Sequence, residues 1–226
     1  MFMLKGIIFD LDGVIVDTAE FHFRAWQELG KKINITFDRD FNENLKGISR
    51  MESLERILEF GGRANDFTLE EKNQLAQEKN EDYKELIKQI TPKDILPGVK
   101  EFLDACVERG IHFSLASASK NGPAILEYLE LTDVFEKIVD PSELINGKPD
   151  PEIFLKGAAM LGLSVDDCIG IEDAEAGIEA INRASMFSVG VGNPVSMKEA
   201  DLFVEDTADL NLDEIVEAFN KYHDKK

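Results

Sequence analysis

The sequence is poor in cysteine and contains no long hydrophobic run. Its two cysteines, Cys106 and Cys168, lie far apart within apolar segments. Disulfide-rich folds and thiolate zinc sites need more cysteines at closer spacing, so we expect two buried free thiols instead. No stretch approaches the roughly 18 apolar residues of a transmembrane helix. Hydrophobic residues still make up 43% of the chain, which predicts a folded globular protein.

Basic residues are scarce relative to acidic ones. The chain has 25 Lys and Arg against 45 Asp and Glu, a formal net charge of −20. This balance argues against a basic face for DNA or RNA and against binding to an anionic membrane. Most of the acidity indicates solubility. An anionic phosphate substrate would be repelled at long range, so a site for one needs local cations and a metal ion.

Residues 1–5 lack the basic region, apolar region and cleavage site of a signal peptide. Together with the low cysteine content, this predicts a cytoplasmic protein. No segment resembles an obligate interface, so we expect a monomer.

Short apolar runs alternate with amphipathic segments along most of the chain. Helices are predicted between and after these runs, and residues 221–226 are expected to be a frayed helix end. This alternation predicts an α/β fold, a Rossmann-like parallel sheet with helices on both faces. Strands are expected at residues 5–10, 111–117, 137–140, 168–172, 187–191 and 201–205.

A helical block interrupts this pattern directly after the first strand. Residues 18–89 are helical in pattern, rich in Glu and Lys, and broken at Gly61-Gly62. Asp17 and Glu20 have the spacing of a capping box, which predicts the start of the block's first helix. The predicted domains are an α/β core of residues 1–17 and 92–226 and a helical cap of residues 18–91.

Chemically active side chains lie where four of the expected strands end. Ligands of open parallel sheets bind beyond the carboxyl ends of the strands, so these side chains should share one edge. Taken singly, each has a simple structural explanation: a turn, a backbone contact, a solvated lysine or a helix start. Their coincidence at strand ends favours a site. The residues are Asp10, Asp12, Ser117, Lys148, Glu172 and Asp173.

This set of side chains suits phosphoryl transfer. The oxygens of Asp10, Glu172 and Asp173 are the hard ligands that Mg²⁺ prefers, and the cation offsets repulsion between a carboxylate and a phosphate. Asp10 would be the nucleophile that becomes phosphorylated. Asp12 would protonate the leaving oxygen and later deprotonate the acceptor. The hydroxyl and the ammonium at the other strand ends would hold phosphoryl oxygens.

Several segments resemble known motifs. Four of them resemble the four motifs of the haloacid dehalogenase superfamily: DLDGVIVDT (10–18), Ser117, Lys148 and GIEDAEAG (170–177). The helical insertion resembles the small helical cap of that superfamily. The resemblance covers essentially the whole chain. Four further segments are similar to sugar-phosphate mutases of that superfamily: AEFHFRAW (19–26), LKGISR (45–50), ASASKNGP (116–123) and KPDPEIF (148–154).

The resemblance implies an activity and a set of roles. The activity interconverts β-glucose 1-phosphate and glucose 6-phosphate through β-glucose 1,6-bisphosphate, with one Mg²⁺ per site and the bisphosphate as intermediate and activator. The implied metal ligands are Asp10, Asp12 through its carbonyl, Glu172 and Asp173. The implied phosphoryl contacts are Ser117, Ala118 and Lys148. The implied substrate contacts are His22, Trp26, Lys46, Gly47, Ser49 and Arg50 on the cap and Ser119, Lys120 and Asn121 on the core.

The cap residues themselves support this assignment only in part. His22 and Trp26 are four residues apart and share a helix face, where packing is an equally good explanation. Arg50 has the forked donors that suit a second, non-transferring phosphate. Lys79 is a further candidate to face the site, and residues 59–79 match no motif.

Three functions remain open at this point. A mutase and a phosphatase can use the same scaffold, and they differ in whether water reaches the phosphorylated aspartate. A cap that hinges near Thr18 and Pro92 could exclude water. A non-catalytic phosphate-sensing domain is the weakest alternative, because every chemical residue is present. Fold alone does not decide among them.

Overall fold

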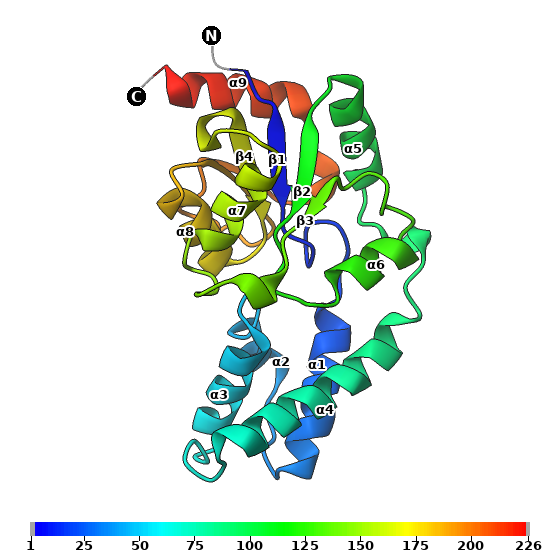
Figure 1. Cartoon of the computed structure of the whole chain (residues 1–226), viewed down its shortest axis with the longest axis vertical. Helices are drawn as coiled ribbons and strands as arrows, with labels where there is room; N and C mark the ends of the chain where they lie inside the picture. Colours follow the sequence, from blue (N-terminus) through cyan, green and yellow to red (C-terminus); the bar gives the residue numbers. More distant parts are fainter. Residues whose placement is uncertain (1–2, 225–226) are drawn as a thin grey trace.

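A computed structural model describes residues 3–224. Figure 1 shows two parts stacked along the long axis, a sheet flanked by helices above and a group of helices below. The predictions for the first two residues and for Lys225 and Lys226 lie outside the described residues. Among the helices of residues 3–224, none is both long enough and apolar enough to cross a membrane.

The upper part is built on a six-stranded parallel sheet in the order β3-β2-β1-β4-β5-β6. This confirms the predicted α/β class. The central strand β1 pairs on both sides, with Phe9 level with Leu115 of β2 and Ile171 of β4. The three central strands therefore end at one edge. The strands are β1 Gly6–Phe9, β2 His112–Leu115, β3 Lys137–Ile138, β4 Cys168–Glu172, β5 Phe187–Val191 and β6 Leu202–Val204.

Helices cover both faces of this sheet, as the sequence predicted. Side chains of β1 alternate, so Ile7 and Phe9 pack on one face and Ile8 on the other. The first face carries α5 (Val99–Glu108), α6 (Gly122–Tyr128) and α9 (Leu212–His223), and the second carries α7 (Glu152–Met160) and α8 (Glu175–Arg183). Short 3₁₀ turns are η1 Pro92–Asp94, η2 Pro141–Glu143, η3 Val165–Asp167 and η4 Thr207–Asp209.

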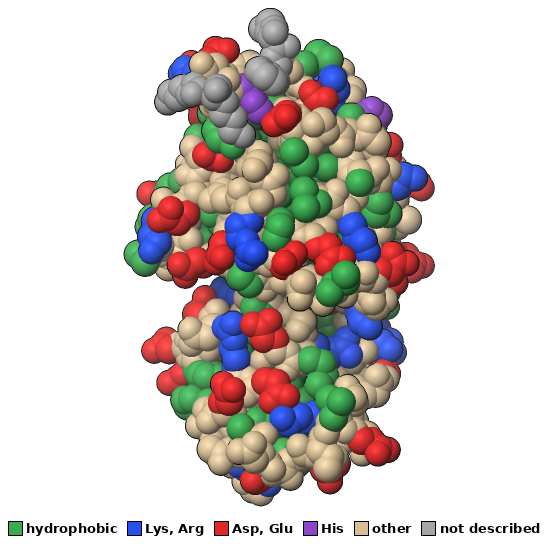
Figure 2. Space-filling model, turned by 60° about the vertical axis from the view of Figure 1, so that its left-hand side comes forward, with side chains coloured by type: hydrophobic (Ala, Val, Ile, Leu, Met, Phe, Trp, Pro, Cys, Tyr) green, Lys and Arg blue, Asp and Glu red, His purple; other side chains and the backbone are tan. Residues whose placement is uncertain are grey.

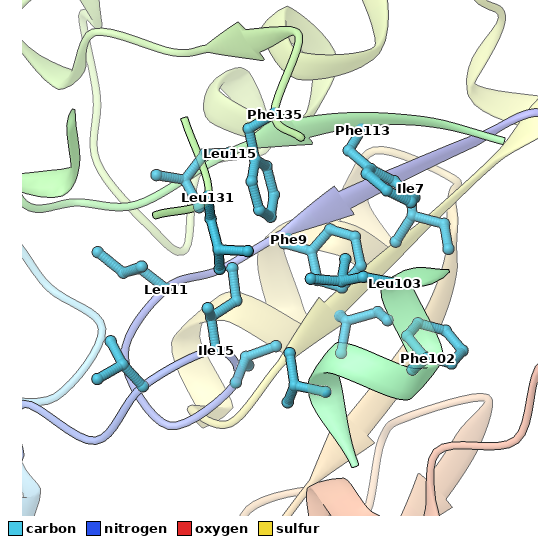
Figure 3. Close-up of a cluster of buried hydrophobic side chains, with 14 of the residues drawn as sticks. Ile7, Phe9, Leu11, Ile15, Phe102, Leu103, Phe113, Leu115, Leu131 and Phe135 are labelled. Atoms are coloured by element: carbon cyan, nitrogen blue, oxygen red, sulfur yellow. The ribbon is translucent and has the colours of Figure 1, made fainter. Parts of the chain in front are cut away.

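Phe9 lies at the centre of the first face (Figure 3). Its ring makes edge contacts with Phe102, Phe113 and Phe135 at centroid distances of 6.3, 5.5 and 5.6 Å. Edge contacts of this kind stabilise a core beyond the burial of area. The residue directly before Asp10 is thus held rigidly.

The lower part contains four helices with a hydrophobic core of their own. Trp26, Leu29, Leu54 and Leu58 are among its buried side chains. Two chain segments join it to the sheet, and they meet at a bridge between Val16 and Ile95. The helices are α1 Ala19–Lys32, α2 Arg39–Glu43, α3 Arg50–Phe60 and α4 Leu69–Ile87.

Two local predictions were wrong. Helix α1 begins at Ala19, close to the predicted start near Thr18, but the predicted capping box is absent: Asp17 accepts the N–H of Ala19, and Glu20 pairs with Arg39 at 2.6 Å. The expected fraying from residue 221 onward does not occur in the described part, because α9 continues to the buried His223. Packing of α9 on the sheet holds that end in place.

The cysteine prediction is confirmed. Cys106 and Cys168 are free and buried. Burial raises the pKa of both thiols to about 12, so neither is a reactive thiolate near neutral pH.

Candidate active site

The carboxyl edge of the sheet brings the predicted acidic residues together. Asp10 continues β1, and its backbone N–H donates to the carbonyl of Ile171 at 3.0 Å. Glu172 ends β4, and Asp173 follows it. One carboxylate oxygen of each of these three acidic residues lies within 4.8 Å of the others, a spacing that could hold a metal ion.

Lys148 ties two of these carboxylates together. Its Nζ donates to Oδ1 of Asp10 at 2.6 Å and to Oε2 of Glu172 at 2.7 Å, and its side chain is fully buried. The other oxygen of Glu172 accepts the backbone N–H groups of Asp173 and Ala174 at 3.2 and 3.1 Å. Glu172 is therefore fixed by three donors.

Burial and mutual repulsion raise the pKa values of the acidic residues Glu172 and Asp173. Burial and the charge of Asp10 raise the pKa of Glu172 to about 7, against the opposing effect of Lys148. Burial, Glu172 and Asp10 raise the pKa of Asp173 well above its usual range. Burial alone would lower the pKa of Lys148, but Asp10 and Glu172 outweigh it and raise that pKa. A divalent cation would relieve this repulsion, so the donor set fits Mg²⁺.

Two glycines leave room for these carboxylates. A Cβ atom on Gly177 would lie 2.0 Å from the carboxyl group of Glu172. A Cβ on Gly13 would lie 2.1 Å from Oδ2 of Asp173, and Gly13 also has a φ of +73°. Neither position accepts a side chain without displacing an acidic residue.

Asp12 has a different environment from Asp10. The hydroxyl of Thr18 donates to Oδ1 of Asp12. Burial and the charge of Asp10 raise the pKa of Asp12 to about 7, opposed by the Thr18 hydrogen bond and by Lys148 and Lys79. A carboxyl group with a pKa near neutrality can both give and take a proton in one cycle.

The loop after β2 forms another part of the site. Oγ of the buried Ser117 accepts the N–H of Ser119 at 3.1 Å, and Oγ of Ser119 accepts the N–H of Asn121 at 3.2 Å. These turns set the loop's shape just before α6 begins at Gly122. Ser117 and Asp10 line the same cavity.

The helical part covers this edge, and the two parts together line a cavity of about 90 Å³. A Cβ on Gly47 would come within 2.8 Å of the Ala174 side chain, so the two parts are in contact. Figure 2 shows the narrowing between them on one face. The predicted residues that line the cavity are Asp10, Asp12, His22, Trp26, Lys46, Gly47, Arg50, Ser117, Ala118, Ser119, Asn121 and Asp173.

Four predicted residues do not line the cavity. Lys148 and Glu172 are buried against Asp10. Oγ of Ser49 accepts the N–H of Glu52 at 3.2 Å and so caps α3. Lys120 is exposed. Lys148 and Glu172 therefore belong to the site through their contacts with Asp10 and with each other. Ser49 and Lys120 lie away from the cavity wall.

Lys79, the weaker candidate, lines the cavity. Its Nζ lies 2.8 Å from Nδ1 of His22 and over the rings of Trp26 and Tyr83, at 4.7 and 4.6 Å from their centroids. Burial and Arg50 lower the pKa of Lys79 to about 7. Burial, Lys79 and Arg50 lower the pKa of His22 well below its usual range, so His22 is neutral.

Sequence reasoning missed several lining residues on the cap. Asn80 is the clearest case, because its Oδ1 accepts Nδ2 of Asn121 at 3.0 Å across the two parts. A signal was available: Lys79 and Asn80 occupy the buried register of α4 set by Ala76 and Tyr83. The unpredicted lining residues are Ala19, Asn42, Leu45, Ile48, Ser53 and Asn80.

The fold and the acidic strand ends define a phosphoryl-transfer scaffold, and comparison with known proteins gives its family. Residues 4–185 match the family model described as haloacid dehalogenase-like hydrolase, so the chain belongs to this family. The β-phosphoglucomutase of Bacillus subtilis is 53% identical over 219 residues, 97% of both chains.

A crystal structure of β-phosphoglucomutase from Clostridium difficile superposes with a TM-score of 0.96 at 51% identity, covering 98% of this chain and 99% of that one. The phosphorylated carbohydrates phosphatase of Thermotoga maritima is 28% identical over 81% of this chain and 82% of its own.

Proposed function

We propose that the protein interconverts β-D-glucose 1-phosphate and D-glucose 6-phosphate through β-glucose 1,6-bisphosphate and a phosphorylated Asp10. It is then a phosphomutase, an isomerase by class. The observation that carries this proposal is the 53% identity to a β-phosphoglucomutase over 97% of both chains. The position of the cavity supports it, since residues of the helical part line it opposite Asp10 and Asp12, and a mutase must keep water from its phosphorylated intermediate.

In the proposed reaction, a carboxylate oxygen of Asp10 attacks phosphorus of the bisphosphate. The new O–P bond forms as the bond from phosphorus to the sugar oxygen breaks. Protonated Asp12 gives its proton to that leaving oxygen. In the other half of the cycle, Asp12 removes the proton from the 6-hydroxyl of β-glucose 1-phosphate as that oxygen takes the phosphoryl group from Asp10 and the Asp10 O–P bond breaks. The bisphosphate formed in this way reorients so that its 1-phosphate faces Asp10. The pKa of Asp12 near 7 supports both transfers.

One Mg²⁺ would be held by Asp10, Glu172, Asp173 and the carbonyl of Asp12. When bound, the cation would offset the repulsion between the carboxylate nucleophile and the phosphate. Lys148 holds Asp10 and Glu172 in place through its two hydrogen bonds. Ser117, Ala118 and Lys148 are proposed to contact the transferring phosphoryl group.

Cap and core residues are proposed to bind the rest of the substrate. Arg50, on the cavity wall, is assigned to the non-transferring phosphate because its guanidinium can bind two oxygens at once. Residues 18–91 are proposed to move as one cap against residues 1–17 and 92–226. The remaining proposed contacts are His22, Trp26, Lys46, Gly47, Ser49, Ser119, Lys120 and Asn121.

The protein's surroundings also stay a proposal. We propose a small-molecule sugar phosphate as its partner, with no nucleic acid and no membrane. The expected monomer and cytoplasmic location rest on the same sequence features as before.

A phosphatase is the second candidate, and the similarity to the Thermotoga maritima phosphatase favours it. The deciding assay supplies Mg²⁺, β-glucose 1-phosphate and a trace of the bisphosphate. A mutase forms glucose 6-phosphate with little inorganic phosphate. Release of inorganic phosphate in place of glucose 6-phosphate would establish the phosphatase.

The nucleophile is tested by Asp10→Asn. The amide is nearly the same size but cannot attack phosphorus, so turnover should fall by at least about 1,000-fold, as for other covalent nucleophiles. Circular dichroism should show an unchanged fold. Appreciable remaining mutase activity would remove Asp10 from this role.

A further inference from the structure

The side chain of Asn42 is a polar group in the cavity wall that the proposed reaction does not use. Asn42 lies on the short helix α2 and is only 7% exposed. It lines the cavity together with Lys46 and Ser53. Within residues 3–224, its Oδ1 is enclosed and has no hydrogen-bond partner. An enclosed amide oxygen without a partner is costly, so its retention needs an explanation.

The backbone of Asn42 is fully engaged, which leaves the side chain as the unexplained part. Its N–H donates to the carbonyl of Asp38 at 3.2 Å, and its carbonyl accepts the N–H of Leu45 at 2.9 Å. The carboxylate of Asp38 caps the same helix by accepting the N–H of Phe41 at 2.9 Å. The side chain of Asn42 is therefore held in the cavity wall by a fixed backbone.

The chemistry of the amide indicates what it would bind. An amide has one acceptor and two donors and no charge, which matches a hydroxyl that can donate and accept. Phosphate groups are better matched by the cations of the same cavity, Lys46, Arg50 and Lys79. The part of a sugar phosphate that remains for Asn42 is a ring hydroxyl.

We propose that Asn42 binds a hydroxyl of the sugar ring and is a specificity-determining residue. The identity of the sugar phosphate rests on the proposed function, but the hydroxyl contact does not depend on turnover. A site built to pair with a hydroxyl rejects a ligand that lacks it, because the enclosed amide is then left unpaired.

The test measures binding in the Asp10→Asn background, where no phosphoryl transfer interferes. Titration calorimetry gives dissociation constants for β-glucose 1-phosphate and for its 2-, 3- and 4-deoxy analogues, with and without Asn42→Ala. Asn42→Ala should weaken binding of the parent sugar by about 5- to 20-fold. It should leave unchanged the affinity for the one deoxy analogue that lacks the paired hydroxyl.

Matched variants make the outcome decisive. Asn44→Ala, an exposed asparagine two residues away, should bind all four ligands like the parent protein. Asn42→Leu, similar in size and apolar, replaces Asn42→Ala if thermal melting shows that alanine disturbs the cap. Equal weakening for all four ligands, or no weakening for any, overturns the proposal. A matching loss of affinity for inorganic phosphate overturns it too, because it makes Asn42 a phosphate ligand.

The proposed function is judged separately, by turnover of the unaltered protein. A protein without mutase activity can still show the hydroxyl-specific loss, and the Asn42 assignment then stands alone. If β-glucose 1-phosphate does not bind the Asp10→Asn protein, the assignment fails.

Discussion

At the scale of one residue, the buried ammonium of Lys79 lowers the stability of the fold while it lines the proposed site. Its ammonium is buried against His22 and the rings of Trp26 and Tyr83, with no carboxylate bonded to it in the described chain. Burial and Arg50 lower the pKa of Lys79 from 10.5 to about 7, and Asp12 only partly opposes this. In the unfolded chain the same lysine is protonated up to its ordinary pKa.

Replacing this lysine should therefore stabilise the fold near neutral pH. From pH 7 to about 10.5 the unfolded chain binds a proton that the folded protein does not, so the wild-type protein gains stability as pH rises. Lys79→Met should raise the free energy of unfolding by roughly 2–4 kcal/mol at pH 7, and by clearly less at pH 9. Urea unfolding at both pH values measures the difference.

Lys84→Met is the matched control, since Lys84 is exposed on the same helix. It should change stability little at either pH. A Lys79→Met difference that does not shrink between pH 7 and 9 would contradict the assignment of the lowered pKa. Activity should fall in the same variant, because Lys79 lines the cavity.

Single residues were predictable where the strand ends fixed them. Asp10, Ser117 and Glu172 follow or end strands whose register the hydrophobic runs already indicated, so their convergence follows from sheet geometry. Asn42 and Ser53 were not predictable in this way. They reach the cavity only because separate cap helices pack together, and helical periodicity does not report that packing.

At the scale of elements, α8 approaches β4 so closely that one helix position must be glycine. A Cβ on Gly177 would lie 2.0 Å from the carboxyl group of Glu172. Glu172 cannot yield easily, because Lys148 and two backbone N–H groups hold both of its oxygens. A side chain at position 177 must therefore displace either the glutamate or the helix.

Gly177→Ala should disturb the proposed metal site more than the fold. We expect the Mg²⁺ concentration for half-maximal activity to rise by about 10-fold or more, the range seen when the support of a metal ligand is removed. Titrating activity with Mg²⁺ measures this. Glu179→Ala, on the exposed side of the same helix, should leave the Mg²⁺ dependence unchanged. An unaltered Mg²⁺ dependence in Gly177→Ala would show that the site tolerates the shift.

The elements themselves were predicted well, and their ends less so. The order of the six strands along the chain and the helices between them followed from alternating periodicity. The capping box predicted at the start of α1 does not form, because Glu20 pairs with Arg39 from α2. A capping pattern in the sequence cannot report a competing tertiary partner.

At the scale of the whole molecule, the net charge of −20 does not gather into one acidic face in the view of Figure 2. Acidic and basic side chains lie beside one another on both parts there. The cations that line the cavity, Lys46, Arg50 and Lys79, all come from the cap. Closure of the cap would therefore supply the positive charge that a phosphate needs at an otherwise acidic edge.

A hydrogen bond between Asn80 and Asn121 joins cap and core beside the site. It is buried, at 3.0 Å, between α4 and the loop before α6. If Asn80 is replaced, the amide of Asn121 has no partner in the closed form, and only the closed form carries this cost. An unpaired buried amide costs about 1–2 kcal/mol, so the equilibrium shifts toward the open form by roughly 5- to 30-fold.

Asn80→Ala should therefore shift the products from mutase toward phosphatase, because an open cap admits water to phosphorylated Asp10. We expect the ratio of inorganic phosphate to glucose 6-phosphate to rise by at least about 5-fold, following the shift in closure. Both products are measured in one assay with β-glucose 1-phosphate, Mg²⁺ and a trace of bisphosphate. Asn73→Ala, an exposed asparagine on α4, should keep the wild-type ratio. A slower reaction with an unchanged ratio would mean that Asn80 positions the substrate and does not hold the cap closed.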